Sequence, residues 1–118
     1  MHAEIIAIGA ELLLGEIVDT NSAHLARALR DSGLDVHWIS VVGDDEARIA
    51  EVVAHALRRS PIVITTGGLG PTVDDLTREA IARACGCELE YRPELWAQIV
   101  ARFERFKRKP TENNRKQA

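Results

Sequence analysis

The sequence is poor in cysteine, and its only two thiols, Cys85 and Cys87, are separated by a single glycine. Two cysteines are too few for a disulfide framework or a four-ligand zinc site, and no further Cys or His pair has a suitable spacing. We therefore interpret them as two partly buried thiols near a turn.

Long apolar runs are also absent. No segment stays apolar long enough to cross a bilayer, and His2 to Ile8 is a short apolar run without the basic preface of a secretion signal. We expect a cytoplasmic protein that does not associate with membranes.

The chain carries little net charge, formally −3, but the charge is unevenly spread. Six of the 15 basic residues lie within the last fourteen positions: Arg105, Lys107, Arg108, Lys109, Arg115 and Lys116. The rest of the chain is therefore acidic and does not attract nucleic acid phosphates, so we predict no nucleic acid as the main partner.

What is present suits one globular domain. The 118 residues are 46% hydrophobic and 28% charged, which is enough for a single core and too little for two. We assign residues 1–107 to that domain and residues 108–118 to a basic polar tail, which we expect to be mobile or ordered by a partner because it has almost no apolar side chains.

Strand and helix patterns alternate along the chain. Apolar, β-branched segments predict strands at residues 3–8, 34–42 and 61–66 and a short one at 88–91, whereas helical spacing and caps predict helices at 20–32, 46–59, from Thr72 or Asp74 to Ala84, and 93–107. We expect the last helix to pack on the sheet. This order favours a largely parallel sheet covered on both faces, with ligand-binding loops after Ile8, Val42 and Thr66 at the carboxyl ends of the strands.

The segment after the third strand has the strongest functional pattern. Gly67, Gly68 and Gly70 lie between a buried strand and a helix, where glycine lets the backbone approach a ligand and a helix start offers free N–H groups to a phosphate. The spacing matches neither a P-loop nor the Gly-x-Gly-x-x-Gly fingerprint.

Carboxylates surround this loop. Asp74 and Asp75 would repel a phosphate unless a divalent cation lay between them, although Thr72-x-x-Asp75 also fits a capping box. Asp44-Asp45 follows the second strand with the same two interpretations, a helix cap or a ligand site. The first strand is followed by Glu11 and then by further polar groups, Asp19, Thr20 and Asn21.

Together these motifs resemble the amino-terminal domain of the CinA (competence/damage-inducible) family. The resemblance covers essentially the whole chain and rests on four segments: Gly9-Ala10-Glu11-Leu12-Leu13-Leu14-Gly15, Asp19-Thr20-Asn21, Val42-Gly43-Asp44-Asp45 and the run from Thr65 to Ala80. That domain belongs to the molybdopterin-binding group with MoaB, MogA and MoeA.

The resemblance implies a three-layer α/β/α sandwich of the MogA type with a mostly parallel sheet. It implies catalytic and metal-binding roles for Asp44 and Asp75, with Mg, Mn or Co as the cation. It implies that a nucleotide or pterin ligand, including molybdopterin, contacts Gly9, Glu11, Asp19, Asn21, Thr66, Gly67, Gly68, Leu69, Gly70 and Asp74.

Three functions follow as hypotheses. CinA-type domains are associated with hydrolysis of ADP-ribose to AMP and ribose 5-phosphate, whereas MogA-type relatives transfer AMP to molybdopterin, and Leu69 and Asp74 favour the CinA pattern. The third is a non-catalytic nucleotide-binding or oligomerisation module. The resemblance also implies a homo-oligomer, a dimer or trimer, and places a final strand, a small-residue loop and a deamidase domain beyond Ala118, so deamidase activity is not assigned to this chain.

Overall fold

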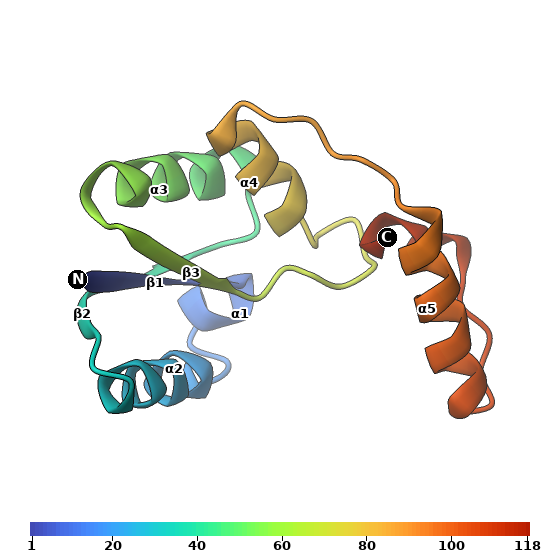
Figure 1. Cartoon of the computed structure of the whole chain (residues 1–118), viewed down its shortest axis with the longest axis horizontal. Coiled ribbons are helices and arrows are strands. Elements are labelled where there is room, and N and C mark those ends of the chain that lie inside the picture. The colour runs from blue at the N-terminus through green and yellow to red at the C-terminus, as the bar shows by residue number, and fades with distance from the viewer.

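A three-layer α/β/α sandwich forms the body of the protein (Figure 1). The computed structural model describes every residue from Met1 to Ala118. The elements are β1 (His2–Ile8), α1 (Ala10–Leu13), α2 (Thr20–Asp31), β2 (Asp35–Val42), α3 (Glu46–Arg59), β3 (Ile62–Thr66), α4 (Thr77–Cys85), α5 (Pro93–Arg105) and the 3₁₀ helix η1 (Glu112–Gln117). The three strands are parallel in the order β2-β1-β3, with α2 on one face and α3 and α4 on the other, which confirms the predicted fold class.

The central strand β1 aligns the ends of its two neighbours. Every residue from Ala3 to Ile8 is buried, as expected of a strand with a sheet neighbour on each side and helices above and below. Ile8 pairs with Val42 of β2, and Ala7 pairs with Thr66 of β3. The loops after Ile8, Val42 and Thr66 therefore meet at one edge of the sheet, as predicted.

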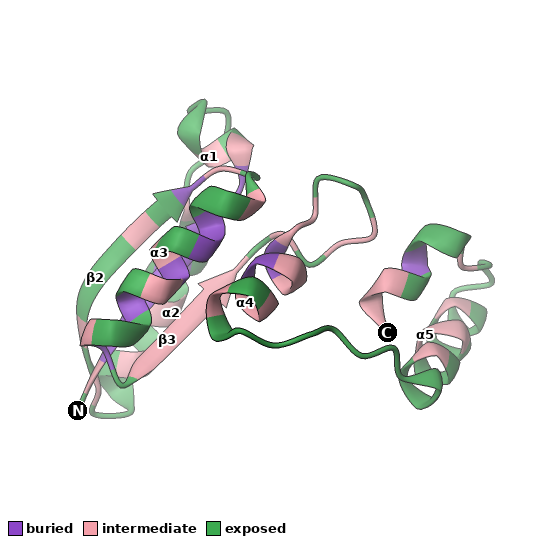
Figure 2. Ribbon diagram, turned by 90° about the horizontal axis from the view of Figure 1, so that it is seen from above, coloured by how far each residue is buried: buried purple, intermediate pink, exposed green.

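Helix α3 provides most of the core on its face of the sheet. Its side chains Ile49, Val53 and Ala56 are buried, whereas Leu57 is exposed (Figure 2). No helix of the protein combines the length and the apolar character that crossing a bilayer requires.

A buried ion pair links β1 to the end of α3. Glu4 is 1% exposed, and its carboxylate accepts two hydrogen bonds from Arg59, at 2.9 and 2.8 Å, and one from Ser60 Oγ at 2.8 Å. The Arg59 guanidinium also lies 3.9 Å over the ring of Trp38. Apolar spacing alone does not reveal such a charged partner inside the sheet.

Three local predictions between the third strand and α5 were wrong. Helix α4 begins at Thr77 and not at Thr72 or Asp74, because the preceding residues form turns around the glycine loop. Residues 88–91 form no strand and lead away from the sheet. Cys85 and Cys87 are exposed and not partly buried, since α4 ends at Gly86 in a left-handed conformation that turns the chain outward.

Helix α5 does not pack on the sheet, contrary to the prediction. It contacts η1, and the two elements form an arm that projects from the sandwich (Figure 1). The predicted irregular tail instead contains η1, where Asn114 is buried and accepts hydrogen bonds from the amide and hydroxyl of Thr111. The guanidinium of Arg115 lies 4.9 Å from the centroid of the Trp96 ring, which joins η1 to α5 within the arm.

Candidate functional site

The predicted carboxylates meet at the carboxyl edge of the sheet. A cavity of about 110 Å³ is lined by Glu11, Asp44, Asp74 and Asp75, together with Gly9 and Gly68. We call it the acidic cavity. The structure thus brings Asp44 and Asp75, from separate crossovers, into one site.

A second cavity adjoins the first. It also measures about 110 Å³, shares Ile8 and Glu11 with the acidic cavity, and is lined by four further predicted residues, Asp19, Asn21, Thr66 and Gly67. We call it the polar cavity. Leu69 and Gly70 are the two predicted ligand residues that line neither cavity.

The two aspartates after β2 have different tasks. Asp45 caps α3, because its Oδ1 accepts a hydrogen bond of 2.9 Å from the amide of Arg48. Asp44 takes no part in this cap and lines the acidic cavity. Both interpretations of this acidic pair therefore apply, each to one residue. Asp19 has both roles. Its carboxylate caps α2 by accepting a hydrogen bond of 3.0 Å from the Ser22 amide, and the residue also lines the polar cavity.

The glycine loop needs glycine for two physical reasons. Gly67 and Gly68 have φ values of +93° and +68°, which side chains rarely adopt. A Cβ at Gly67 would also overlap the carbonyl oxygen of Ile8, and one at Gly68 would overlap the hydroxyl of Thr77. The loop can therefore lie directly against β1 and the start of α4 only because these positions lack side chains.

All four carbonyls of the loop are held by the chain itself. Those of Gly67 and Gly68 accept from the hydroxyl and the amide of Thr77, at 2.7 and 3.2 Å. Those of Leu69 and Gly70 accept from the guanidinium of Arg78, at 2.8 and 2.9 Å. The carbonyls are thus directed to Thr77 and Arg78.

Three of the four amides of the same loop are left free. Those of Gly67, Gly68 and Leu69 donate to no acceptor within the chain. Successive free N–H groups in a loop with fixed carbonyls form the kind of concave donor set that binds anions. Of these residues, Gly68 lines the acidic cavity and Gly67 lines the polar cavity, so the loop offers a hydrogen-bond donor to each.

The surroundings of the Asp75 carboxyl group favour its ionised form. Its Oδ2 accepts from the hydroxyl of Thr72 at 2.7 Å and from the Thr72 amide at 2.9 Å. These hydrogen bonds, opposed by partial burial and aided by the Gly70 amide and the charge of Lys116, hold the pKa of Asp75 below its ordinary value. The contact between Thr72 and Asp75 predicted as a helix cap does form, but it closes a turn before the helix.

The carboxylates suit a cation shared with a ligand. No three His, Cys, Asp or Glu side chains lie close enough together to form a metal-binding group by themselves. Magnesium is commonly held by one or two carboxylates, with waters and substrate phosphates supplying the other oxygens. Asp44 and Asp75, on one cavity that Gly68 also lines, fit that arrangement.

Four residues that support the loop were missed by the sequence analysis: Thr77, Arg78, Lys116 and Gln117. Thr77 and Arg78 directly follow the loop, so their proximity was visible in the sequence although their hydrogen bonds were not. Lys116 donates to the carbonyls of Thr72 and Asp75, and Gln117 donates to that of Leu69 at 3.2 Å. No local pattern signals contacts over such sequence separations.

Comparison with known proteins agrees with this geometry. Residues 4–114 match the family described as "Probable molybdopterin binding domain". A competence-damage inducible protein of Halothermothrix orenii is 52% identical over all 118 residues, which correspond to 29% of the relative's length. The crystal structure of CinA from Thermoplasma acidophilum, a protein of unknown function, superimposes with a TM-score of 0.90 at 34% identity and covers 98% of this chain and 68% of its own.

This chain belongs to the CinA family of molybdopterin-binding domains. It corresponds to the part of the CinA relatives that carries this domain, and it spans less than a third of the curated relative's length. MoaB from Thermus thermophilus, a molybdopterin biosynthesis enzyme, shares the fold with a TM-score of 0.63 at 24% identity, over 68% of this chain and 52% of its own.

Proposed function

We propose that this CinA-type domain binds a dinucleotide-type diphosphate such as ADP-ribose and hydrolyses its phosphoanhydride bond with a divalent cation, Mg, Mn or Co. One observation carries the proposal: Gly68, whose amide is free, lines the same cavity as Asp44, Asp74 and Asp75, and Gly67, whose amide is also free, lines the adjoining polar cavity. Amides alone suit any anion, whereas amides with carboxylates suit a phosphate that arrives with a cation.

Cleavage of a phosphoanhydride bond depends more on stabilising negative charge than on forming a covalent bond between the substrate and the protein. In the reaction, a water oxygen bonds to one phosphorus while that phosphorus loses the bridging oxygen, giving AMP and ribose 5-phosphate. A cation held by Asp44 and Asp75 would supply electrostatic stabilisation of the diphosphate. The loop amides hold the phosphate oxygens where negative charge builds up.

The test compares the cavity residues Asp44 and Asp75 with Asp45, which is adjacent to Asp44 but caps α3. We expect Asp75→Asn and Asp44→Asn to abolish release of AMP from ADP-ribose in the presence of each cation in turn, while circular dichroism shows an intact fold. Asp45→Asn is the matched control, because it removes the same charge but keeps a good helix cap, and it should retain activity. Normal hydrolysis by Asp75→Asn would overturn the proposal.

A second candidate is binding of molybdopterin, or adenylyl transfer to it. The family description and the shared MoaB fold favour it. The same loop and cavities would then hold a pterin phosphate. Calorimetric titration with molybdopterin and with ADP-ribose separates the two candidates, since each predicts preference for its own ligand.

A third candidate is a non-catalytic nucleotide-binding or oligomerisation module, acting in the expected dimer or trimer. It predicts that ADP-ribose raises the melting temperature without any product being formed. Light scattering coupled to size exclusion gives the oligomeric state directly.

A further inference from the structure

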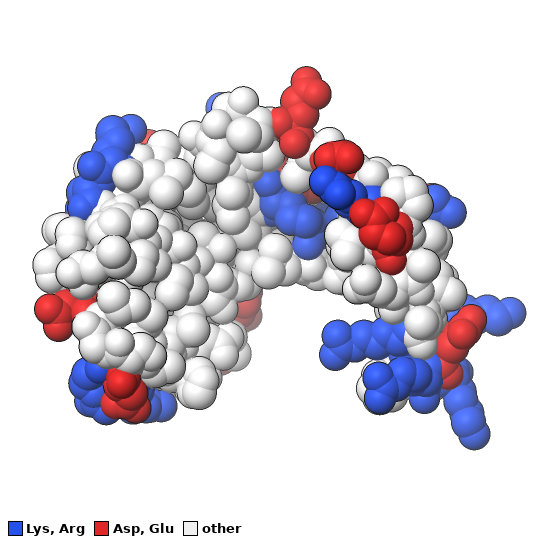
Figure 3. Space-filling view, viewed as in Figure 1, with Lys and Arg blue, Asp and Glu red and all other residues white.

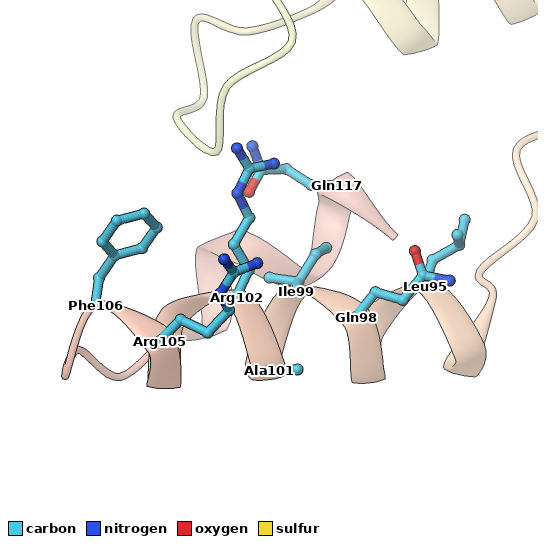
Figure 4. Close-up of a pocket in the computed structure, with 8 residues that line it drawn as sticks. All are labelled: Leu95, Gln98, Ile99, Ala101, Arg102, Arg105, Phe106 and Gln117. Atoms are coloured by element: carbon cyan, nitrogen blue, oxygen red, sulfur yellow. The ribbon is translucent and has the colours of Figure 1, made fainter.

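Helix α5 carries apolar side chains that the chain does not bury. Leu95, Ile99 and Phe106 follow helical spacing and rise from one side of the helix, yet no residue of α5 is buried (Figure 4). These three side chains line a cavity of about 650 Å³ along the arm, and Phe106 is 68% exposed. We call them the arm stripe. An amphipathic helix places such a stripe against another surface, so the arm offers a docking face.

Positive charge surrounds the arm stripe. Five basic residues at this end of the arm are exposed and take part in none of the ion pairs of the protein: Arg102, Arg105, Lys107, Arg108 and Lys109. Glu104 is the only carboxylate between residues 95 and 111. A surface that covers the arm stripe must therefore supply apolar contacts together with negative charge.

The segment that follows β1 offers both. Four of its aliphatic side chains, within six positions, are 60, 71, 54 and 82% exposed: Leu13, Leu14, Ile17 and Val18. Its charged residues are all acidic, Glu11, Glu16 and Asp19, and no Lys or Arg precedes Arg27 in the chain. We call the four aliphatic side chains and these carboxylates the α1 patch. Neighbouring exposed apolar side chains with a polar rim are typical of an interaction site.

The arm is held away from the α1 patch of its own chain. Lys116 donates to the carbonyl of Asp75 at 2.6 Å, and Gln117 donates to that of Leu69 at 3.2 Å, so η1 is fixed to the glycine loop. Figures 1 and 2 show α1 and α5 well apart. Figure 3 shows a hollow between the sandwich and the arm, with Lys and Arg side chains on the arm's side of it.

The chain is also less compact than a single domain of its length. Its radius of gyration is 15.6 Å. A compact domain of this length is expected to have a radius of gyration of about 13.5 Å. Only 17 of 118 residues are buried, so apolar surface remains for contact with another molecule.

We propose that the arm stripe of one copy docks on the α1 patch of a second copy, and that the exchange is reciprocal, giving a two-fold dimer. Two chains are the smallest assembly that covers both surfaces of each copy. Pairing arm with arm would bring positive charges together, and pairing patch with patch would bring carboxylates together. The inference does not depend on the proposed function, because it assumes no bound ligand.

The test places one charge of the wrong sign on each surface. The wild-type protein should have twice the chain mass of 13.0 kDa by light scattering coupled to size exclusion. We expect Leu14→Lys, and separately Phe106→Glu, to raise the dissociation constant of the dimer roughly a hundredfold, because a tenfold loss occurs at both contacts of the dimer. Circular dichroism checks the fold. Leu57→Lys, at an exposed leucine of α3 outside both surfaces, is the control and should remain dimeric.

A mixture of the two variants tests which surfaces meet. A mixed dimer keeps one undisturbed contact, between the arm of the Leu14→Lys chain and the patch of the Phe106→Glu chain. We therefore expect association in the mixture to be about tenfold tighter than in either variant alone. Because opposite charges meet, added NaCl should weaken the wild-type dimer.

Four results would overturn the proposal. The wild-type protein would stay at 13.0 kDa at every concentration, as a chain whose arm closes on its own sandwich would. Leu14→Lys would leave the dimer intact, which would indicate pairing of arm with arm, or Phe106→Glu would do so, which would indicate pairing of patch with patch. The mixture would associate no better than the separate variants.

Discussion

The ammonium group of Lys116 donates a hydrogen bond of 2.6 Å to the main-chain carbonyl of Asp75, across 41 residues of sequence. The same group donates to the carbonyl of Thr72. A residue of the arm therefore helps to hold the turn that carries a predicted catalytic carboxylate.

Lys116→Met should loosen that turn. We expect amide exchange in residues 69–76 to rise about tenfold, because loss of a charged hydrogen-bond donor removes roughly 1.4 kcal/mol of local stability. Hydrogen exchange followed by mass spectrometry measures this directly. Lys109→Met, which removes a lysine that makes no side-chain hydrogen bond or ion pair, is the control, and equal exchange in the two variants would contradict the role of Lys116.

Gly67→Ala should lower the free energy of unfolding far more than Gly33→Ala does. Gly67 and Gly33 both have positive φ, +93° and +82°, but an added Cβ meets the Ile8 carbonyl only at Gly67, and at Gly33 it meets nothing within 4 Å. We expect Gly33→Ala to cost about 1 kcal/mol of unfolding free energy and Gly67→Ala roughly 3 kcal/mol or more. Urea denaturation compares the two, and similar losses would mean that the loop is not pressed against β1.

Arg59→Met should destabilise the protein strongly. The change leaves the Glu4 carboxylate, 1% exposed, without its charged partner, which we expect to cost about 3–5 kcal/mol. Its neighbour Arg58 has one side-chain hydrogen bond, to His55 at 3.4 Å, so Arg58→Met should change the unfolding free energy by less than about 0.5 kcal/mol. If the two variants lose the same unfolding free energy, the ion pair between Arg59 and Glu4 contributes little to stability.

The ion pair between Glu4 and Arg59 also predicts that the protein loses stability as the pH falls. Hydrogen bonds from Arg59, opposed by burial and aided by Ser60, hold the pKa of Glu4 below its usual value. A lowered folded-state pKa gives stability that is fully present above the unfolded-state pKa of about 4.3 and is lost as pH falls through the folded value. In the Glu4→Gln variant, the unfolding free energy measured by denaturation should lack this part of the pH dependence. If the variant's unfolding free energy falls with pH below 4 as steeply as that of the wild-type protein, the prediction is wrong.

Thr72→Val should raise the pKa of the Asp75 carboxyl towards its ordinary value. The substitution removes the 2.7 Å hydroxyl hydrogen bond, the main cause of the lowered pKa, and leaves the Thr72 amide in place. Carboxyl NMR titration measures the change. Thr65→Val, in β3 and without a hydroxyl contact to Asp75, should leave the titration unchanged.

Much of the site could be predicted because its determinants are local. The apolar strand before Gly67, the positive-φ requirement of the loop and the helix caps at Asp19 and Asp45 depend on neighbouring residues, and each has a recognisable pattern. The parallel order of strands then implies that the loops after Ile8, Val42 and Thr66 share one edge. The resemblance to the CinA family added the choice of Asp44 over Asp45, which the cap geometry agrees with.

The sequence by itself determined the α/β architecture, the glycine loop and the edge of the sheet where carboxylates gather, because periodicity, turn chemistry and capping act over a few residues. Only the tertiary structure decided that Arg59 neutralises Glu4, that α5 leaves the sheet, and that Lys116 and Gln117 return to the loop. These contacts join residues more than 40 positions apart. Their partners are chosen by packing in three dimensions, which no short-range pattern encodes.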